Sequence, residues 1–72
     1  MTDVKFLIEL GATIRKLRNR KGISQNELAG NCGLDKANIS RIESGKINVT
    51  VLTLKKISKE LSVSISDLCN GR

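Results

Sequence analysis

Residues 24–45 read SQNELAGNCGLDKANISRIESG, and this stretch decides the fold. Ser24 and Glu27 form the S-x-x-E pattern of a capping box, which predicts that a helix begins directly after Ser24. Gly33 can take the positive φ of a turn too tight for a Cβ, and Asp35 is a good N-cap for the next helix. The stretch therefore predicts two short helices joined by a tight turn.

The apolar residues of this stretch are placed so that the two helices pack on each other and on the rest of the chain. They are Leu28, Ala29, Cys32, Leu34, Ile39 and Ile42. Ala29 is small where the first helix must approach the second, near Ile39. Cys32 is expected to act as a small buried hydrophobe. The pattern is a helix-turn-helix, whose second helix can enter the major groove of DNA.

Before this stretch, residues 4–21 carry apolar residues at helical spacing. One face is formed by Leu7, Leu10, Gly11, Ile14 and Leu17. Basic residues crowd the last two turns, where cations suit the helix dipole, and Gly22 ends the helix. We expect this basic end to give general attraction to an anionic partner rather than direct contacts.

After the stretch, the sequence predicts two more helices. Thr50 is the N-cap of a helix that runs to about Leu61. A shorter helix begins after Ser64, with Asp67 in its first turn and Leu68 turned inward. The core face of the longer helix is expected to hold Val51, Leu54, Ile57, Ser58 and Leu61. The predicted fold is therefore all-α: one compact five-helix domain over residues 1–72, with the helix-turn-helix at about 24–45 and the last two helices at about 50–70.

Composition excludes several classes of function. The 72 residues contain no His, so no Ser-His-Asp or Cys-His nucleophile system and no His-based zinc site can form. The two cysteines make no CxxC pair and are expected to be reduced thiols of a cytoplasmic protein. We expect no enzyme activity, no metal or other cofactor, no small-molecule ligand and no membrane partner. Thirteen Lys and Arg against seven Asp and Glu give a net charge of +6, which favours a nucleic-acid partner.

The stretches LGATIRKLRNRKGISQNELA and NCGLDKANISRIESGKINVTVLTLKKISKELSVSISDL resemble the lambda-repressor-like, or Cro/XRE-type, family of bacterial and phage regulators. The resemblance covers residues 10–68 and is specific because it is a spaced set over five helices. Within it, LDKANISRIESGKINVT resembles restriction–modification controller proteins. Two positions depart from the family pattern: Val49 stands where many members have Pro, and Leu52 stands where members often carry Glu.

The resemblance implies roles for individual side chains. Base-edge readers would be Lys36, Ala37, Asn38 and Arg41, residue types that can pair with guanine or adenine or touch a thymine methyl. Phosphate contacts would come from Gln25, Ser40, Ser44, Lys46 and Asn48. Arg18 and Glu43 would form a buried ion pair between the first and third helices, with a structural role.

The sequence thus predicts a sequence-specific DNA-binding transcriptional regulator. We expect a homodimeric repressor or controller on an inverted-repeat operator in double-stranded DNA, because one short helix reads only a few base pairs. The expected dimer surface comprises Leu52, Val63, Ile65 and Leu68. Leu52, like Ile8, lies off the core stripe of its helix, as an interface residue or a scattered exposed one would. The alternative is an antitoxin or other protein-interaction module with the same fold.

Overall fold

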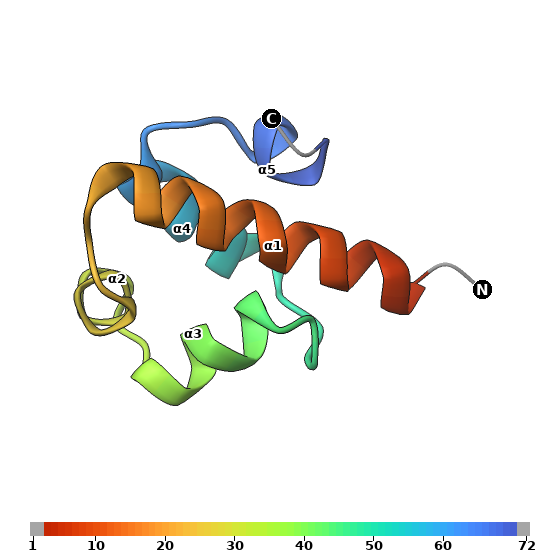
Figure 1. Cartoon of the computed structure of the whole chain (residues 1–72), viewed down its shortest axis with the longest axis horizontal. Coiled ribbons are helices and arrows are strands. Elements are labelled where there is room, and N and C mark those ends of the chain that lie inside the picture. Colours follow the sequence, from red (N-terminus) through yellow and green to blue (C-terminus); the bar gives the residue numbers. More distant parts are fainter. Residues whose placement is uncertain (1–2, 71–72) are drawn as a thin grey trace.

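The protein, seen in a computed structural model that describes residues 3–70, consists of helices and connecting loops (Figure 1). In this part of the chain there are five helices and no strand, which confirms the expected all-α class. The helices are α1 (Asp3–Lys21), α2 (Gln25–Cys32), α3 (Lys36–Glu43), α4 (Val51–Leu61) and α5 (Ile65–Cys69). No helix within residues 3–70 has both the length and the apolar content that crossing a bilayer requires.

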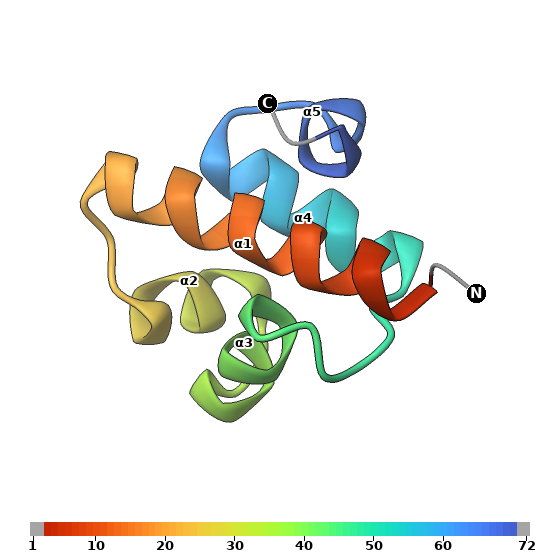
Figure 2. The ribbon, with the colours of Figure 1, turned by 45° about the vertical axis from the view of Figure 1, so that its right-hand side comes forward.

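The long helix α1 lies across the whole molecule and contacts α3, α4 and α5 (Figure 2). On one side of it, α2 and α3 pack closely on each other, and α2 also contacts α4. On the other side, the short helix α5 covers α1 and α4. The two helices of the predicted helix-turn-helix are therefore held from behind by α1 and α4.

One hydrophobic core joins all five helices. Its fully buried large side chains are Ile14, Leu28, Ile39, Ile57 and Leu68, one from each helix in chain order. Ala29 and Cys32 are buried beside them in α2, as the sequence predicts. Burial of an apolar side chain of this size stabilises the folded state by about 1.5–3 kcal/mol, so this small core accounts for much of the driving force.

Side-chain caps fix most of the helix starts. Ser24 accepts a hydrogen bond from the Glu27 backbone N–H, and Glu27 accepts one from the Ser24 N–H, so the predicted capping box is present. Thr50 caps α4 in the predicted way, and Ser64 forms a second capping box with Asp67. Asp35 occupies the N-cap position of α3, but its side chain makes no capping hydrogen bond.

Gly11 allows α1 to lie directly on the C-terminal end of α3. A Cβ at position 11 would stand 2.3 Å from the backbone oxygen of Ile42 and 2.5 Å from that of Glu43. These distances are well inside van der Waals contact, so the backbones of α1 and α3 approach each other as closely as they do only because residue 11 lacks a side chain.

Two expectations about apolar positions are wrong. Val51 is 73% exposed, because it is the first residue of α4 and lies beyond the part of the helix that packs on the core. Leu68 was expected on the dimer surface, but it is fully buried between α5 and the rest of the monomer. Its side chain is therefore unavailable to a partner. Ile8 and Leu52 are 51% and 62% exposed, which confirms that they lie off the core stripes.

Candidate nucleic-acid interface

The turn between α2 and α3 presents α3 to solvent. Gly33 adopts φ 69°, the left-handed conformation predicted for a tight turn. The Leu34 N–H donates to the Ala29 carbonyl at 2.8 Å, which ends α2 and turns the chain toward α3. Ile39 and Ile42 then anchor α3 on the core, and the opposite face of α3 is left open.

The four expected base-reading residues lie on α3, and three of them are exposed. Lys36, Ala37 and Arg41 are exposed, and Asn38 is half-buried. Arg41 Nη1 donates to Asn38 Oδ1 at 3.1 Å, a contact one helical turn apart. The guanidinium and the amide are thus held side by side on the open face. This arrangement suits base reading because each of the two groups can bond a base edge through two atoms.

The expected phosphate-binding residues lie mostly near the C-terminal end of α3. Ser44, Lys46 and Asn48 lie exposed at the end of α3 and in the loop that follows, and Ser40 is half-buried on α3. Gln25 lies across the motif, at the first position of α2. Gln25 bonds Glu43, the last residue of α3, so it lies at the same end of that helix as Ser44.

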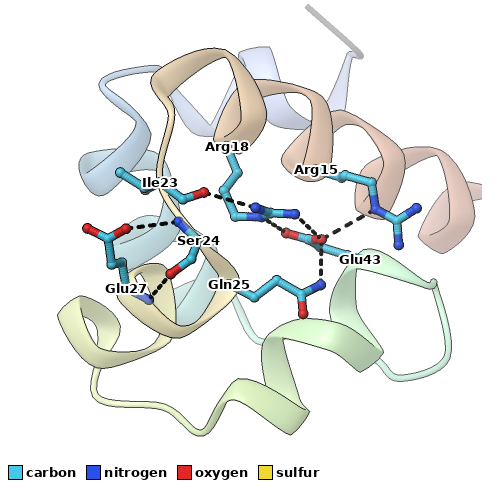
Figure 3. A network of polar contacts seen from close by, with 7 residues as sticks. All are labelled: Arg15, Arg18, Ile23, Ser24, Gln25, Glu27 and Glu43. Carbon is cyan, nitrogen blue, oxygen red and sulfur yellow. Dashed lines mark hydrogen bonds and ion pairs between the residues drawn. The ribbon is translucent and has the colours of Figure 1, made fainter.

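Glu43, the last residue of α3, is the centre of a buried polar cluster (Figure 3). The expected ion pair is present: Arg18 Nε donates to Glu43 Oε2 at 2.6 Å, and Arg18 Nη2 donates to Oε1 at 3.2 Å. Arg18 Nη1 also donates to the Ile23 carbonyl at 2.9 Å. One guanidinium thereby ties α1 to the end of α3 and to the loop before α2.

Two further donors converge on the same carboxylate, and the sequence did not reveal either. Gln25 Nε2 donates to Glu43 Oε1 at 2.9 Å, and Arg15 Nε donates to the same oxygen at 3.4 Å. The only signal in the sequence is the spacing of Arg15 and Arg18, which puts both on neighbouring turns of one helix face. Which acid they meet depends on how α1 packs on α3.

Glu43 is ionised at neutral pH although it is completely buried. Burial by itself raises the pKa of the carboxyl group, since water no longer solvates the charge. Hydrogen bonds from Arg18 and Gln25, together with the Arg18 charge, outweigh this effect and hold the pKa of Glu43 below its ordinary value. The cluster is therefore a charged support for α3 at neutral pH.

Lys21 makes a second unforeseen long-range contact, away from α3. Its Nζ donates to the Glu60 carbonyl at 2.8 Å and to Ser62 Oγ at 2.9 Å, at the C-terminal end of α4. A cation is favourable there because the last carbonyls of a helix carry partial negative charge. Lys21 thus joins the ends of α1 and α4 and is already engaged within the protein.

Both cysteines are free thiols. Cys32 is 3% exposed, and its burial raises the pKa of the thiol, so it behaves as the small buried hydrophobe that the sequence predicts. Cys69 is half-buried beside α1.

The chain is similar to known helix-turn-helix regulators along most of its length. A helix-turn-helix family model matches residues 14–68. Control protein C.MunI of Mycoplasma sp. is 41% identical over 69 residues, which span 94% of this chain and 90% of that protein. Control protein C.BamHI of Bacillus amyloliquefaciens is 41% identical over 59 residues, or 81% of this chain and 73% of that protein. The crystal structure of the restriction-modification controller protein C.AhdI from Aeromonas hydrophila superposes with a TM-score of 0.89 at 31% identity, covering 94% of this chain and 99% of that one.

Proposed function

The chain belongs to the helix-turn-helix family of DNA-binding transcriptional regulators, and from this premise we propose that it works as a homodimeric repressor or controller on an inverted-repeat operator. The family consists of regulators and not of enzymes. The observation that carries the proposal is the open face of α3, where Lys36, Ala37 and Arg41 are exposed on a helix fixed from behind. Since its partner is DNA, the proposal places the protein in the cytoplasm.

We propose two roles for the side chains on and beside this face, and their positions support the assignment. Lys36, Ala37, Asn38 and Arg41 would read base edges in the major groove, because they lie on the helix that enters it. Gln25, Ser40, Ser44, Lys46 and Asn48 would hold the two flanking backbones and set the register of α3. The net charge of +6 supports this arrangement because phosphates supply much of the affinity of such complexes.

A dimer is proposed because one α3 reads too few base pairs to specify an operator. Two copies related by two-fold symmetry would place their α3 helices about 34 Å apart, one turn of DNA. Of the expected surface, Leu52 is 62% exposed, and Val63 and Ile65 are half-buried. Leu52 lies near the start of α4 and the other two follow its end, so a partner using all three would cover the length of α4.

Selection from a random duplex library at near-physiological salt tests the proposal. Enrichment of an inverted repeat, together with a dimer in light scattering at high micromolar concentration, would support it, and the half-site spacing would give the dimer geometry. Weak, salt-sensitive binding without enrichment would contradict it and favour the protein-interaction module. A monomer at that concentration would contradict the proposed surface.

Two substitutions distinguish a base-reading residue from a phosphate-binding one. Arg41→Ala should weaken operator binding by about 1–3 kcal/mol and relax the preference at one base pair. Lys46→Ala should weaken binding to every duplex alike and lower the salt slope by about one unit. Titrations of both variants against operator and scrambled DNA at several salt concentrations measure the two effects. Equal behaviour of the two variants would contradict the division.

A further inference from the structure

Arg15 is the exposed member of the cluster around Glu43. Its side chain is 54% exposed, whereas that of Arg18 is 11% exposed and that of Glu43 is fully buried. Arg15 contacts the carboxylate through Nε alone, and its two terminal nitrogens point away from it (Figure 3). Since no other described residue accepts a hydrogen bond from these nitrogens, their N–H groups are available to a ligand.

Glu43 does not need Arg15 for neutralisation. Arg18 already bonds both carboxylate oxygens, at 2.6 and 3.2 Å, and carries one full positive charge. The Arg15 contact is the longest in the cluster, at 3.4 Å. The cluster of two arginines and one carboxylate therefore has surplus positive charge, which lies on the exposed Arg15 guanidinium. Such a surplus at the surface attracts an anion.

Gln25 brings a second donor to the same place. Its Nε2 bonds the same oxygen, Glu43 Oε1, as Arg15 Nε does, so one atom holds side chains from α1 and α2 (Figure 3). The amide nitrogen of Gln25 carries another N–H. Gln25 is also the first residue of α2, where backbone N–H groups have no acceptor inside the helix. The cluster thus offers fixed donors from two elements beside each other.

We propose that Arg15 and Gln25 bind one and the same backbone phosphate of the operator, and that Glu43 is the positioning residue that holds both. The proposal rests on the proposed function, which already gives Gln25 a phosphate. It adds Arg15, so that the basic end of α1 supplies a direct contact in addition to general attraction. An arginine that is anchored through Nε can present its terminal N–H groups to phosphate oxygens as a fork.

The salt dependence of operator binding tests the role of Arg15 against a matched control. Arg15→Gln and Lys16→Gln each remove one positive charge from neighbouring exposed positions of α1, about 100° apart around the helix. Arg15→Gln should lower the salt slope by about 0.9 and weaken binding about tenfold near 0.1 M salt. Lys16→Gln should lower both much less. Equal losses in the two variants would overturn the proposal, because Arg15 would then add only general attraction.

Neutral methylphosphonates, placed one at a time in the operator, identify the phosphate. The proposal expects one position at which the substitution weakens the wild-type protein strongly and weakens Arg15→Gln and Gln25→Ala less, because each variant keeps only one of the two contacts. Arg15→Lys should recover part of the sensitivity, since it keeps the charge. If the two variants lose sensitivity at different phosphates, or at none, the shared contact is wrong. If Arg15 only supported the fold, Arg15→Gln would bind every operator more weakly but would keep the wild-type pattern of methylphosphonate sensitivity.

These outcomes are separate from failure of the proposed function. If wild-type protein selects no operator, the function fails before any variant is compared. If it selects one and the Arg15 and Lys16 variants match, only the phosphate contact fails. Thermal unfolding of each variant confirms that the compared proteins are folded.

Discussion

Helices α2 and α3 are both eight residues long, but their first turns are built in opposite ways. The first turn of α2 is closed by the Ser24–Glu27 capping box, and its Gln25 side chain is bonded to Glu43. The first turn of α3 has no side-chain cap, and Lys36 and Ala37 are exposed there. At the other end of α3, Glu43 is held by three side chains.

The difference shows which parts of the helix-turn-helix are fixed by hydrogen bonds within the protein. α2 and the C-terminal end of α3 are fixed by hydrogen bonds inside the protein, so they set the position of the motif. At the N-terminal end of α3, which the proposed function directs into the major groove, Lys36 and Ala37 are exposed and Asn38 bonds Arg41 of the same helix. Rigid support at one end and exposed side chains at the other suit a helix that must find its partners on DNA.

The largest expected effect comes from breaking the supported end. Arg18→Ala leaves the Glu43 carboxylate buried without its main partner, which should lower the free energy of unfolding by about 3–5 kcal/mol. Arg15→Ala, which removes the exposed and longest contact, should cost less than about 1 kcal/mol. Urea denaturation monitored by circular dichroism compares the two. Similar losses would mean that Arg18 is not the principal support of Glu43.

Lowering the pH should gradually remove the contribution of Glu43 to the stability of the protein. The pKa of Glu43 is lower in the folded protein than in the unfolded chain, so its contribution to stability is fully present above the unfolded pKa of about 4.3. The contribution is lost as the pH falls through the lower, folded pKa. Urea midpoints at several pH values should therefore stay level from neutral pH to about 5 and then fall. In Arg18→Ala, whose Glu43 has lost its main partner, this acid-dependent part of the fall should shrink. If the urea midpoint of the variant falls with pH as that of the wild type does, then Glu43 is not the cause of the fall.

Two glycine substitutions compare a position packed between helices with one that faces solvent. Gly11→Ala places a methyl group against the Ile42 and Glu43 carbonyls and should destabilise the protein by about 1–3 kcal/mol. Gly30→Ala, on the exposed face of α2 with no atom within 4 Å of the added Cβ, should stabilise it by about 1 kcal/mol. Thermal unfolding of both variants shows whether each substitution raises or lowers stability. A stabilised Gly11→Ala protein would mean that α1 and α3 can separate at little cost.

The features that were predictable from the sequence are those fixed by neighbours along the chain. The S-x-x-E pattern located the start of α2, and Gly33 located the turn, because both act within a few residues. The resemblance located the Arg18–Glu43 pair. The sequence predicts that Leu68 is turned inward, and its complete burial confirms this, so its place in the expected dimer surface was the error.

What the sequence could not give depends on packing between distant elements. That Arg15 and Gln25 share one oxygen of Glu43 follows only once α1, α2 and α3 are assembled. Gly11 lies on the predicted core face, yet the carbonyls that require a glycine there belong to α3.

The smallest expected effects test the two first turns directly. Ser24→Ala removes a cap that makes a hydrogen bond and should lower the free energy of unfolding by about 1 kcal/mol. Asp35→Ala removes a side chain without a capping hydrogen bond, and the expected loss is only about 0.3 kcal/mol, from the helix dipole. Because Asp35 is an exposed negative charge beside the open face of α3, its removal should also strengthen DNA binding. Urea denaturation and DNA titration of both variants measure these effects. If Asp35→Ala instead costs as much as Ser24→Ala, then Asp35 caps α3 in solution, and the two first turns are alike in their support.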